Sequence, residues 1–586
     1  MADSTQLELP FWDDFSTVYL SPDSSLWLTG SGTANVMPGV GIAPPTVNVA
    51  VFDGWNALGK PYSQDDLHYG AGDSLVSRFI DLSTVPPAIR NTVFLSFFWQ
   101  KEGSGEMPDA PDSIRLQVRD DQKQWITLWS IAGPDVSVAD EFFQEIVQIN
   151  DPSFFHPYFQ FRFQSFNRLS GGFDNWNIDY IYFNYGRNAS DLAYEDRALT
   201  SLPGSFLKGY TAMPYDHFIL DLSSNLQPVF VDFYNMHNLV QPIEYTALIR
   251  DTTKIFDVMD HDAVLDPNPA GFERRRIYSS AVDPSVFDDQ NDTLSLCMET
   301  VFYINSGDTL AFNGKVDYRV NDTTIAKVLL SDQLAYDDGS AEWAAGLSDR
   351  GGKIAYRFIV NKPDGLTALK IYFPEFGSGT SGQNFTLMIW DNLHEGVEGR
   401  LLVEQHVVGA SEGLNQFVTY DLGRPVAVAD TFFVGYEQNV SGFFAVGLDK
   451  NTDSGSEIFF NTDGVWEQNT KLIGSLLIRP VFGFKKAVGL QEESLFKDLH
   501  VYPNPTSGWV RVEGYIDGID VMDMLGRPSG VNRIFSKTIL YGEQTQNDKG
   551  KKHILDLDLS DLPNGMYFIR VHKEGHARLV KVVLKR

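Results

Sequence analysis

The segment YFQFRFQSFN, Tyr158 to Asn167, alternates aromatic and polar side chains. Phe159, Phe161 and Phe163 take every second position, and successive side chains of a strand point to opposite faces of a sheet. The alternation therefore predicts a strand with one buried aromatic face. Similar runs recur between clusters of Gly, Pro, Asp and Ser, at NTVFLSFFWQ (91–100), DSIRLQVRDD (112–121) and QWITLWSI (124–131). This spacing predicts an all-β chain of stacked sheets with few helices.

Length and composition predict a large, acidic β-protein of several domains. The 586 residues include 42 Phe, 24 Tyr and 11 Trp, and the formal net charge is -31. At about 100 to 200 residues a domain, the length predicts three to five domains, and abundant aromatic side chains suit pleated, half-buried surfaces. Such negative charge repels phosphate backbones and anionic lipids, which argues against nucleic acid or a membrane surface as partner. The sequence contains no apolar run of 18 residues, so it predicts no transmembrane helix.

The changes in composition predict four β-domains and one linker. We expect two jelly rolls that flank an immunoglobulin-like sandwich, followed by a small immunoglobulin-like domain at the C-terminus. The predicted bounds are 1–187 for the first jelly roll, 188–330 for the immunoglobulin-like sandwich, 331–484 for the second jelly roll, 485–496 for the linker and 497–586 for the last domain.

The first domain carries motifs at both of its ends. It opens with LPFWDDFS (9–16) and closes with SGGFDNWNIDYIYF (170–183), in which two glycines allow a bend and a strand then buries Trp176, Ile178 and Tyr180 on one face. These motifs resemble the first and last strands of MAM-like and lectin-like jelly rolls of cell-surface proteins. The third domain opens with QLAYDDGSAEWAAGL (333–347), which is similar to the start of jelly rolls in secreted Bacteroidetes proteins.

Two groups of carboxylates are candidate Ca²⁺ ligands, because Ca²⁺ prefers oxygen donors. In the first domain, acids converge if the first and last strands pair; in the third, they cluster beside Gly339. The alternatives are solvated edge and turn carboxylates in the first group, and an Asx-turn with an exposed Glu in the second. The candidates are Asp13, Asp14, Asp174 and Asp179 in the first group, and Asp337, Asp338 and Glu342 in the second.

An arginine run and three tryptophans each allow a binding role or a structural role, and the one cysteine favours a structural role. The run Arg274 to Arg276 suits either an anionic partner or a solvated strand face paired with acids. Trp343, Trp390 and Trp466 form either a sugar-binding face or core packing. Cys297 is the one cysteine in the chain, so no intramolecular disulfide forms, and we expect a small buried side chain rather than a nucleophile.

The sequence offers no catalytic motif. Gly-x-Ser-x-Gly, His-Glu-x-x-His, the P-loop and Gly-x-Gly-x-x-Gly after a strand are all absent, and the 11 His are scattered, with His217, His237 and His261 in separate contexts. We therefore predict no enzyme, no catalytic residue and no zinc site. Paired carboxylates for glycoside hydrolysis stay open, because their separation depends on the fold.

The C-terminal domain contains three motifs in a fixed order. VYPNPTSG (501–508) contains Tyr502, Pro503, Asn504, Pro505 and Gly508. Leu562, Pro563, Gly565 and Tyr567 form a turn followed by a strand, and a final strand includes Lys581, Val582 and Lys585. In order and spacing they resemble the type A C-terminal sorting domain of the Bacteroidetes type IX secretion system. The insertion at 528–554 is longer than usual for that family.

The resemblance implies a route and partners. Family members enter the periplasm with a cleavable signal peptide, bind the type IX translocon and its shuttle or attachment machinery, and are released or held at the cell surface. The first residues, MADSTQLELP, lack the basic and apolar regions of a signal peptide, so we expect that such a peptide has been removed. Residues 497–586 carry 14 Lys plus Arg against 11 Asp plus Glu, unlike the acidic remainder, which marks a module with a separate role.

Three hypotheses remain for the preceding domains. The first is a non-catalytic surface or secreted protein that binds a glycan, a partner protein or a surface. The second is a structural subunit that self-assembles into a filament or layer through its acidic face with Ca²⁺. The third is a hydrolase on a lectin-like scaffold. The sequence specifies export more sharply than it specifies any of these activities.

Overall fold

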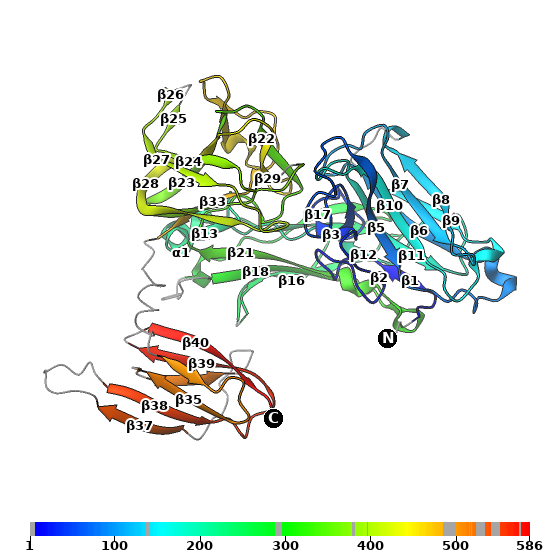
Figure 1. Ribbon diagram of the computed structural model, residues 1–586. Helices are drawn as coiled ribbons and strands as arrows, with labels where there is room; N and C mark the ends of the chain where they lie inside the picture. Colours follow the sequence, from blue (N-terminus) through cyan, green and yellow to red (C-terminus); the bar gives the residue numbers. More distant parts are fainter. Residues whose placement is uncertain are drawn as a thin grey trace. The chain divides into compact units, whose positions relative to one another are not determined.

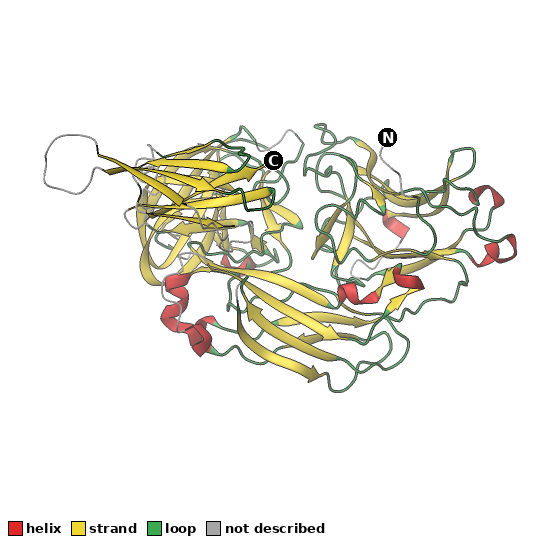
Figure 2. Ribbon diagram, turned by 90° about the horizontal axis from the view of Figure 1, so that it is seen from below, coloured by secondary structure: helices red, strands yellow, loops and turns green. Residues whose placement is uncertain are grey.

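The computed structural model describes residues 6–135, 141–252, 254–287, 296–377, 381–394, 397–483, 499–514, 516, 518–522, 534–540, 551–573 and 576–586. These residues are almost entirely β, so the prediction of tandem β-sandwiches is confirmed. Figure 2 shows only short helical segments between the strands, among them α1 (Tyr215–Phe218) and α2 (Leu222–Asn225). Within the described part of the chain, no helix has the length and apolar character needed to span a membrane.

The chain divides into two compact units, Met1–Gly483 and Phe484–Arg586. The first unit contains three sandwiches and the second contains the C-terminal domain (Figure 1). The predicted linker at 485–496 lies outside the described residues.

The first sandwich packs two antiparallel sheets against each other. One sheet has the order β3-β4-β11-β6-β9 with β1 also on β11, and the other has the order β2-β5-β10-β7-β8. Phe159, Phe161 and Phe163 are fully buried between them, as the alternation predicts. The strands are β1 (Phe11–Asp13), β2 (Trp27–Leu28), β3 (Asn35–Pro38), β4 (Asn48–Phe52), β5 (Tyr69–Ser77), β6 (Phe94–Lys101), β7 (Ser113–Arg119), β8 (Trp125–Ala132), β9 (Phe143–Gln148), β10 (Phe161–Arg168) and β11 (Trp176–Asn184).

The closing strand β11 is buried on both of its faces. Trp176 and Ile178 join the core of the first sandwich, as predicted, and β11 pairs with the opening strand β1. Tyr180 is buried as predicted, but the prediction of its face is wrong: its ring packs with Tyr194 and Tyr318 of the second sandwich. The pairing of β11 with β6 shifts register between Asp179 and Tyr182, and such a bulge turns the side chain at Tyr180 to the other face.

The second sandwich has a three-stranded sheet, β12-β14-β17, and a five-stranded sheet, β13-β21-β18-β15-β16. Cys297 on β18 is exposed, so the expectation of a buried thiol is wrong. The alternation of β18 turns Met298 and Thr300 inward and Cys297 outward. The strands are β12 (Arg197–Leu199), β13 (Ala212–Pro214), β14 (Phe230–Asn235), β15 (Glu244–Arg250), β16 (Ile255–Val264), β17 (Arg274–Tyr278), β18 (Leu296–Asn305) and β21 (Thr323–Ser331), with β19 (Leu310–Ala311) and β20 (Val316–Asp317) as a separate pair.

The third sandwich continues the hydrophobic core of the second, since one cluster of buried side chains runs from Leu199 to Phe482. Its larger sheet contains the long strands β23 and β28, and its smaller sheet has the order β22-β29-β32. The strands are β22 (Trp343–Leu347), β23 (Lys353–Ile371), β24 (Asn384–Trp390), β27 (Leu401–Val408), β28 (Val418–Gln438), β29 (Phe444–Asp449), β30 (Ile458–Asn461), β31 (Glu467–Gln468), β32 (Ser475–Leu476) and β33 (Ile478–Phe482), with β25 (Leu393–His394) and β26 (Val397–Glu398) as a small hairpin.

The first sandwich also contacts the third directly. The indole of Trp55 donates to the Glu375 carbonyl at 2.5 Å, and its ring packs against Phe376. The amide of Gly377 donates to the Ser170 carbonyl at 2.7 Å. The three sandwiches therefore form one body through both polar and apolar contacts.

The C-terminal unit is a small sandwich with its own core. Its sheets have the orders β34-β35-β38-β37 and β36-β39-β40. Part of the unusual insertion at 528–554 forms β37, which pairs with β38. The strands are β34 (His500–Tyr502), β35 (Trp509–Gly514), β36 (Gly518–Met522), β37 (Ile534–Leu540), β38 (Lys551–Asp558), β39 (Gly565–Lys573) and β40 (His576–Leu584).

Candidate functional site

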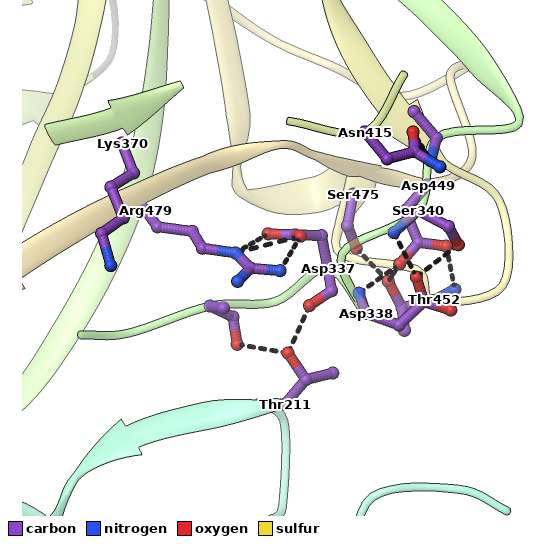
Figure 3. Close-up of polar contacts among 12 residues, drawn as sticks. Thr211, Asp337, Asp338, Ser340, Lys370, Asn415, Asp449, Thr452, Ser475 and Arg479 are labelled. Carbon is purple, nitrogen blue, oxygen red and sulfur yellow. Dashed lines mark hydrogen bonds and ion pairs between the residues drawn. The ribbon is translucent and has the colours of Figure 1, made fainter. Parts of the chain in front are cut away.

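The predicted acids of the third sandwich separate into two environments (Figure 3). Asp337 points toward Arg479, which donates to both of its carboxylate oxygens, so Asp337 belongs to a buried ion pair. Asp338 and Glu342 lie with Asp449, an acid at the end of β29 that the sequence analysis did not single out.

Hydrogen-bond donors surround this second group. The amide and hydroxyl of Ser340 donate to Asp338 Oδ1 at 2.8 and 2.6 Å, and the Asp338 amide donates to Asp449 Oδ2 at 2.7 Å. Glu342 Oε2 accepts the Lys450 amide at 2.8 Å, and Glu342 Oε1 accepts a hydrogen bond from the side-chain amide of Asn451 at 3.2 Å. Asp338 and Ser340 thus form an Asx-turn, and the carboxylates are already satisfied by protein donors.

Burial perturbs the acids of this group. Burial, reinforced by repulsion from Asp338, raises the pKa of Glu342 to about 8. Burial and the repulsion of Asp338 and Glu342 raise the pKa of Asp449 well above its usual range. Since an uncompensated charge is costly in a low-dielectric interior, burial favours the protonated form of Glu342.

The predicted acids of the first sandwich do not form one site. Asp13 accepts a hydrogen bond of 2.6 Å from the indole N–H of Trp27 inside the core, and burial raises the pKa of Asp13 to about 7. Asp14 accepts a hydrogen bond from the side-chain amide of Asn321. Asp179 accepts a hydrogen bond from the backbone amide of Thr46 at 2.9 Å. Asp174 lies instead beside two acids that the sequence analysis did not name, Asp109 and Asp112.

A cavity of about 830 Å³ lies where the three sandwiches meet. Its volume is within the range of small-molecule sites, which occur preferentially at domain interfaces. It is lined by residues 38–44 of the first sandwich, by Arg274 to Arg276 and Phe230 of the second, and by residues 450–454 of the third. No sequence motif predicts it, because its walls lie more than 400 residues apart.

The arginine run is partly paired with acids. Arg275 pairs with Glu273, and Arg276 forms two hydrogen bonds of 2.8 Å with Asp232. Arg274 instead stacks on the Tyr234 ring at 3.9 Å and donates to a backbone carbonyl, that of Pro44, at 2.7 Å. The paired-face alternative therefore holds for two of the three, and Arg274 has no carboxylate in contact with it among the described residues.

The tryptophans of the third sandwich are mainly structural. Trp390 and Trp466 are buried and pack edge to face, with ring centroids 5.3 Å apart. The sugar-binding alternative is therefore wrong for these two rings. Trp343 is half-buried, and the Lys450 amine lies 5.5 Å from its ring centroid.

The structure also contains a pair of one histidine and one aspartate that the sequence analysis did not predict. His217 on α1 is buried, and its Nε2 lies 3.0 Å from Asp364 Oδ2 on β23. Asp216 lies close to both groups but also forms an ion pair with Lys362. A separation of 147 residues between His217 and Asp364 left no signal in the sequence.

The three C-terminal motifs converge on the last strand. Asn504 binds the backbone of β40 in both directions: its amide group donates to the Lys581 carbonyl at 2.7 Å, and its carbonyl oxygen accepts the Val583 amide at 2.9 Å. Thr506 continues the pairing with Val583 and Lys585. The opening motif thus acts as a further strand beside β40.

The turn after Leu562 completes this arrangement. Tyr567 donates to the Pro563 carbonyl at 2.8 Å, and Asn564 accepts the backbone amide of Arg586 at 3.0 Å. The Arg586 side chain in turn donates to the Leu562 carbonyl at 2.8 Å. Val582 and Leu584 are buried whereas Lys581 and Lys585 are exposed, as the alternation predicts.

Residues 500–585 match the family model of the secretion system C-terminal sorting domain. The chain therefore carries a type IX sorting domain. This domain supports export by the type IX system and indicates a secreted or cell-surface location. No curated protein matches the chain.

Replacement of Asn504 tests the convergence of the sorting motifs. Asn504→Ala removes two hydrogen bonds to β40, and because the site is exposed we expect a loss of about 1–2 kcal/mol in the free energy of unfolding of the sorting domain. Thermal unfolding of residues 497–586 measures it. Ser507→Ala, an exposed change in the same loop, is the control, and equal stability of the two variants would contradict the role of Asn504.

Replacement of Glu342 tests its buried protonation. Between about pH 4.5 and 8 only the folded state holds this proton, so folding stability falls as pH rises, by up to about 1.4 kcal/mol per pH unit. Glu342→Gln cannot ionise, and its unfolding midpoint should fall less between pH 5 and 8 than that of the wild type. Glu467→Gln, an exposed change in the same sandwich, should follow the wild type. Parallel pH profiles for wild type and Glu342→Gln would disprove the assignment.

Proposed function

We propose that this protein is an exported, non-catalytic binding protein whose three-sandwich unit holds an acidic glycan in the cavity between the sandwiches. The observation that carries the proposal is the charge of the cavity. Five basic side chains line it against three acidic ones, in a chain with a net charge of -31. The basic residues are Arg274, Arg275, Arg276, Lys327 and Lys450, and the acidic residues are Asp232, Asp338 and Asp453.

The surroundings of the basic groups suit a sugar. Phe230 and Tyr210 supply aromatic rings, and hydroxyl groups come from Thr200, Ser201 and other residues of the lining. Aromatic rings pack against apolar faces, and hydroxyl groups donate and accept hydrogen bonds. A planar guanidinium such as that of Arg274 binds a carboxylate through paired hydrogen bonds.

Export supplies the biological setting of the proposal. The sorting domain would bring the chain through the periplasm, after removal of a signal peptide, to the translocon and its shuttle or attachment machinery. The MAM-like and immunoglobulin-like identities of the first two sandwiches fit a surface protein and stay predictions. Self-assembly and hydrolysis also stay predictions, and no contact among the described residues favours either over binding.

Binding of defined oligosaccharides tests the proposal. Isothermal titration with an oligogalacturonate should show binding that weakens with salt, whereas a neutral oligosaccharide of equal length should bind more weakly. Arg274→Ala should lower the affinity for the acidic sugar about tenfold or more, because a hydrogen bond between charged groups is worth about 1.5–3 kcal/mol. Lys327→Ala, on strand β21 of the other sheet of the same sandwich, should also lower the affinity for the acidic sugar.

Arg250→Ala is the matched control. Arg250 lies on β15 of the same sandwich, pairs with Glu299 and is absent from the cavity lining. The variant should keep the affinity of the wild type. Equal affinity for acidic and neutral sugars, or an equal loss in Arg250→Ala, would contradict the proposal.

A further inference from the structure

Three carboxylates meet in the first sandwich at the ends of two strands. Asp112 directly precedes β7, Asp174 lies two residues before β11, and Asp109 lies in the loop between β6 and β7. One carboxylate oxygen from each residue lies within 4.8 Å of those of the other two. Oxygens that share one Ca²⁺ ion at 2.3–2.6 Å are separated by similar distances.

The side chain of Asp112 points to a missing ligand. It is fully buried, and its Oδ2 accepts the Asp109 amide at 2.5 Å. Its Oδ1 is enclosed and accepts no hydrogen bond from any described residue. A buried carboxylate oxygen without a donor is costly, and natural structures normally satisfy such an atom with a partner, a water or an ion.

The basic groups nearby are engaged elsewhere. The Arg168 side chain donates to the Asp66 carbonyl at 2.7 Å and lies over the Phe173 ring, and the Lys101 amine donates to the Gly133 carbonyl at 2.9 Å. Among the described residues, neither forms an ion pair with Asp109, Asp112 or Asp174. Within the described part of the chain, no protein cation therefore contacts this negatively charged group.

The titration of the group agrees with this imbalance. Burial, with repulsion from Asp174, raises the pKa of Asp112 to about 8. The neighbouring Glu106 is also affected, since partial burial and repulsion from Asp174 raise its pKa to about 7. The acids around Asp338 differ, because protein donors surround their oxygens.

We propose that Asp109, Asp112 and Asp174 bind a calcium ion that fixes the β6–β7 loop against the start of β11. The donors are all carboxylate oxygens, which suit Ca²⁺ and lack the nitrogen or sulfur that zinc prefers. Asp109 is exposed, so water can complete the coordination on that side. Ca²⁺ accepts such irregular sets of 6–8 oxygens, whereas Mg²⁺ requires near-octahedral geometry. This inference is independent of the proposed glycan site.

Titration of the full chain with CaCl₂ after removal of metal by a chelator tests the proposal. Wild type should bind Ca²⁺ and unfold at a higher temperature with Ca²⁺ than with the chelator, because a ligand of the folded state stabilises it. Asp112→Asn should weaken Ca²⁺ binding at least about tenfold, since even loss of an outer-shell partner costs metal sites about 10–100-fold. Asp121→Asn, an exposed change in the same sandwich, should bind as the wild type does.

A second measurement does not depend on the folding of Asp112→Asn. The Tyr69 hydroxyl lies 3.5 Å from Asp109 Oδ2, so Tyr69 should sensitise the luminescence of Tb³⁺ bound in place of Ca²⁺. Tyr69→Phe should lower this luminescence while Ca²⁺ still displaces the Tb³⁺. Wild type without Ca²⁺ binding, Ca²⁺ affinity unchanged in Asp112→Asn, or luminescence unchanged in Tyr69→Phe would overturn the proposal. If the stability of the wild type does not change with Ca²⁺ and Asp112→Asn is more stable than the wild type, the acids share a proton instead of binding an ion.

Discussion

The two-sided burial of β11 is the constraint on which the first unit depends. One face of this strand completes the core of the first sandwich through Trp176 and Ile178. The bulge before Tyr182 turns Tyr180 to the opposite face, where its hydroxyl donates to Asp196 at 2.6 Å. A strand with one solvated face could not join two sandwiches, so the position of the second sandwich follows from this strand.

The same junction creates the cavity. The second sandwich shares a hydrophobic core with the third, and the third contacts the first through Trp55 and Phe376. Three sandwiches that contact one another pairwise leave an open cavity between them, and the strand of Arg274 forms part of its wall. The fold thus gathers basic groups at one place in a three-sandwich unit whose net charge is negative.

The distribution of donors decides what the buried acids can do. Amides and hydroxyl groups donate hydrogen bonds to the carboxylate oxygens around Asp338, and the indole of Trp27 donates one to Asp13. These carboxylates organise turns and core contacts. Asp112 has an oxygen without such a donor, although it is the same type of residue at a similar depth. Residue type alone therefore does not distinguish a structural acid from a candidate metal ligand.

Local patterns predicted much of the fold. The alternation in Tyr158 to Asn167, the aromatic closing strand and the C-terminal motifs depend on neighbours in sequence, and each forms the predicted strand or turn. The bulge that redirects Tyr180, and the outward position of Cys297, depend on register with a partner strand, which the sequence does not display. The pairs of Asp174 with Asp112 and of His217 with Asp364 bring together side chains 62 and 147 residues apart, so they appear only in the folded chain.

The sorting domain and the three sandwiches are separate compact units with separate cores and opposite net charges. Because the sorting motifs all lie in the last unit, we expect this unit alone to carry the address for export. The most direct measurement fuses Lys497–Arg586 behind a signal peptide and a fluorescent reporter, in a type IX-competent bacterium and in a mutant without the system. Reporter outside the competent cells alone is the expected result. Reporter retained in the periplasm of both strains would show that the last unit does not suffice for export.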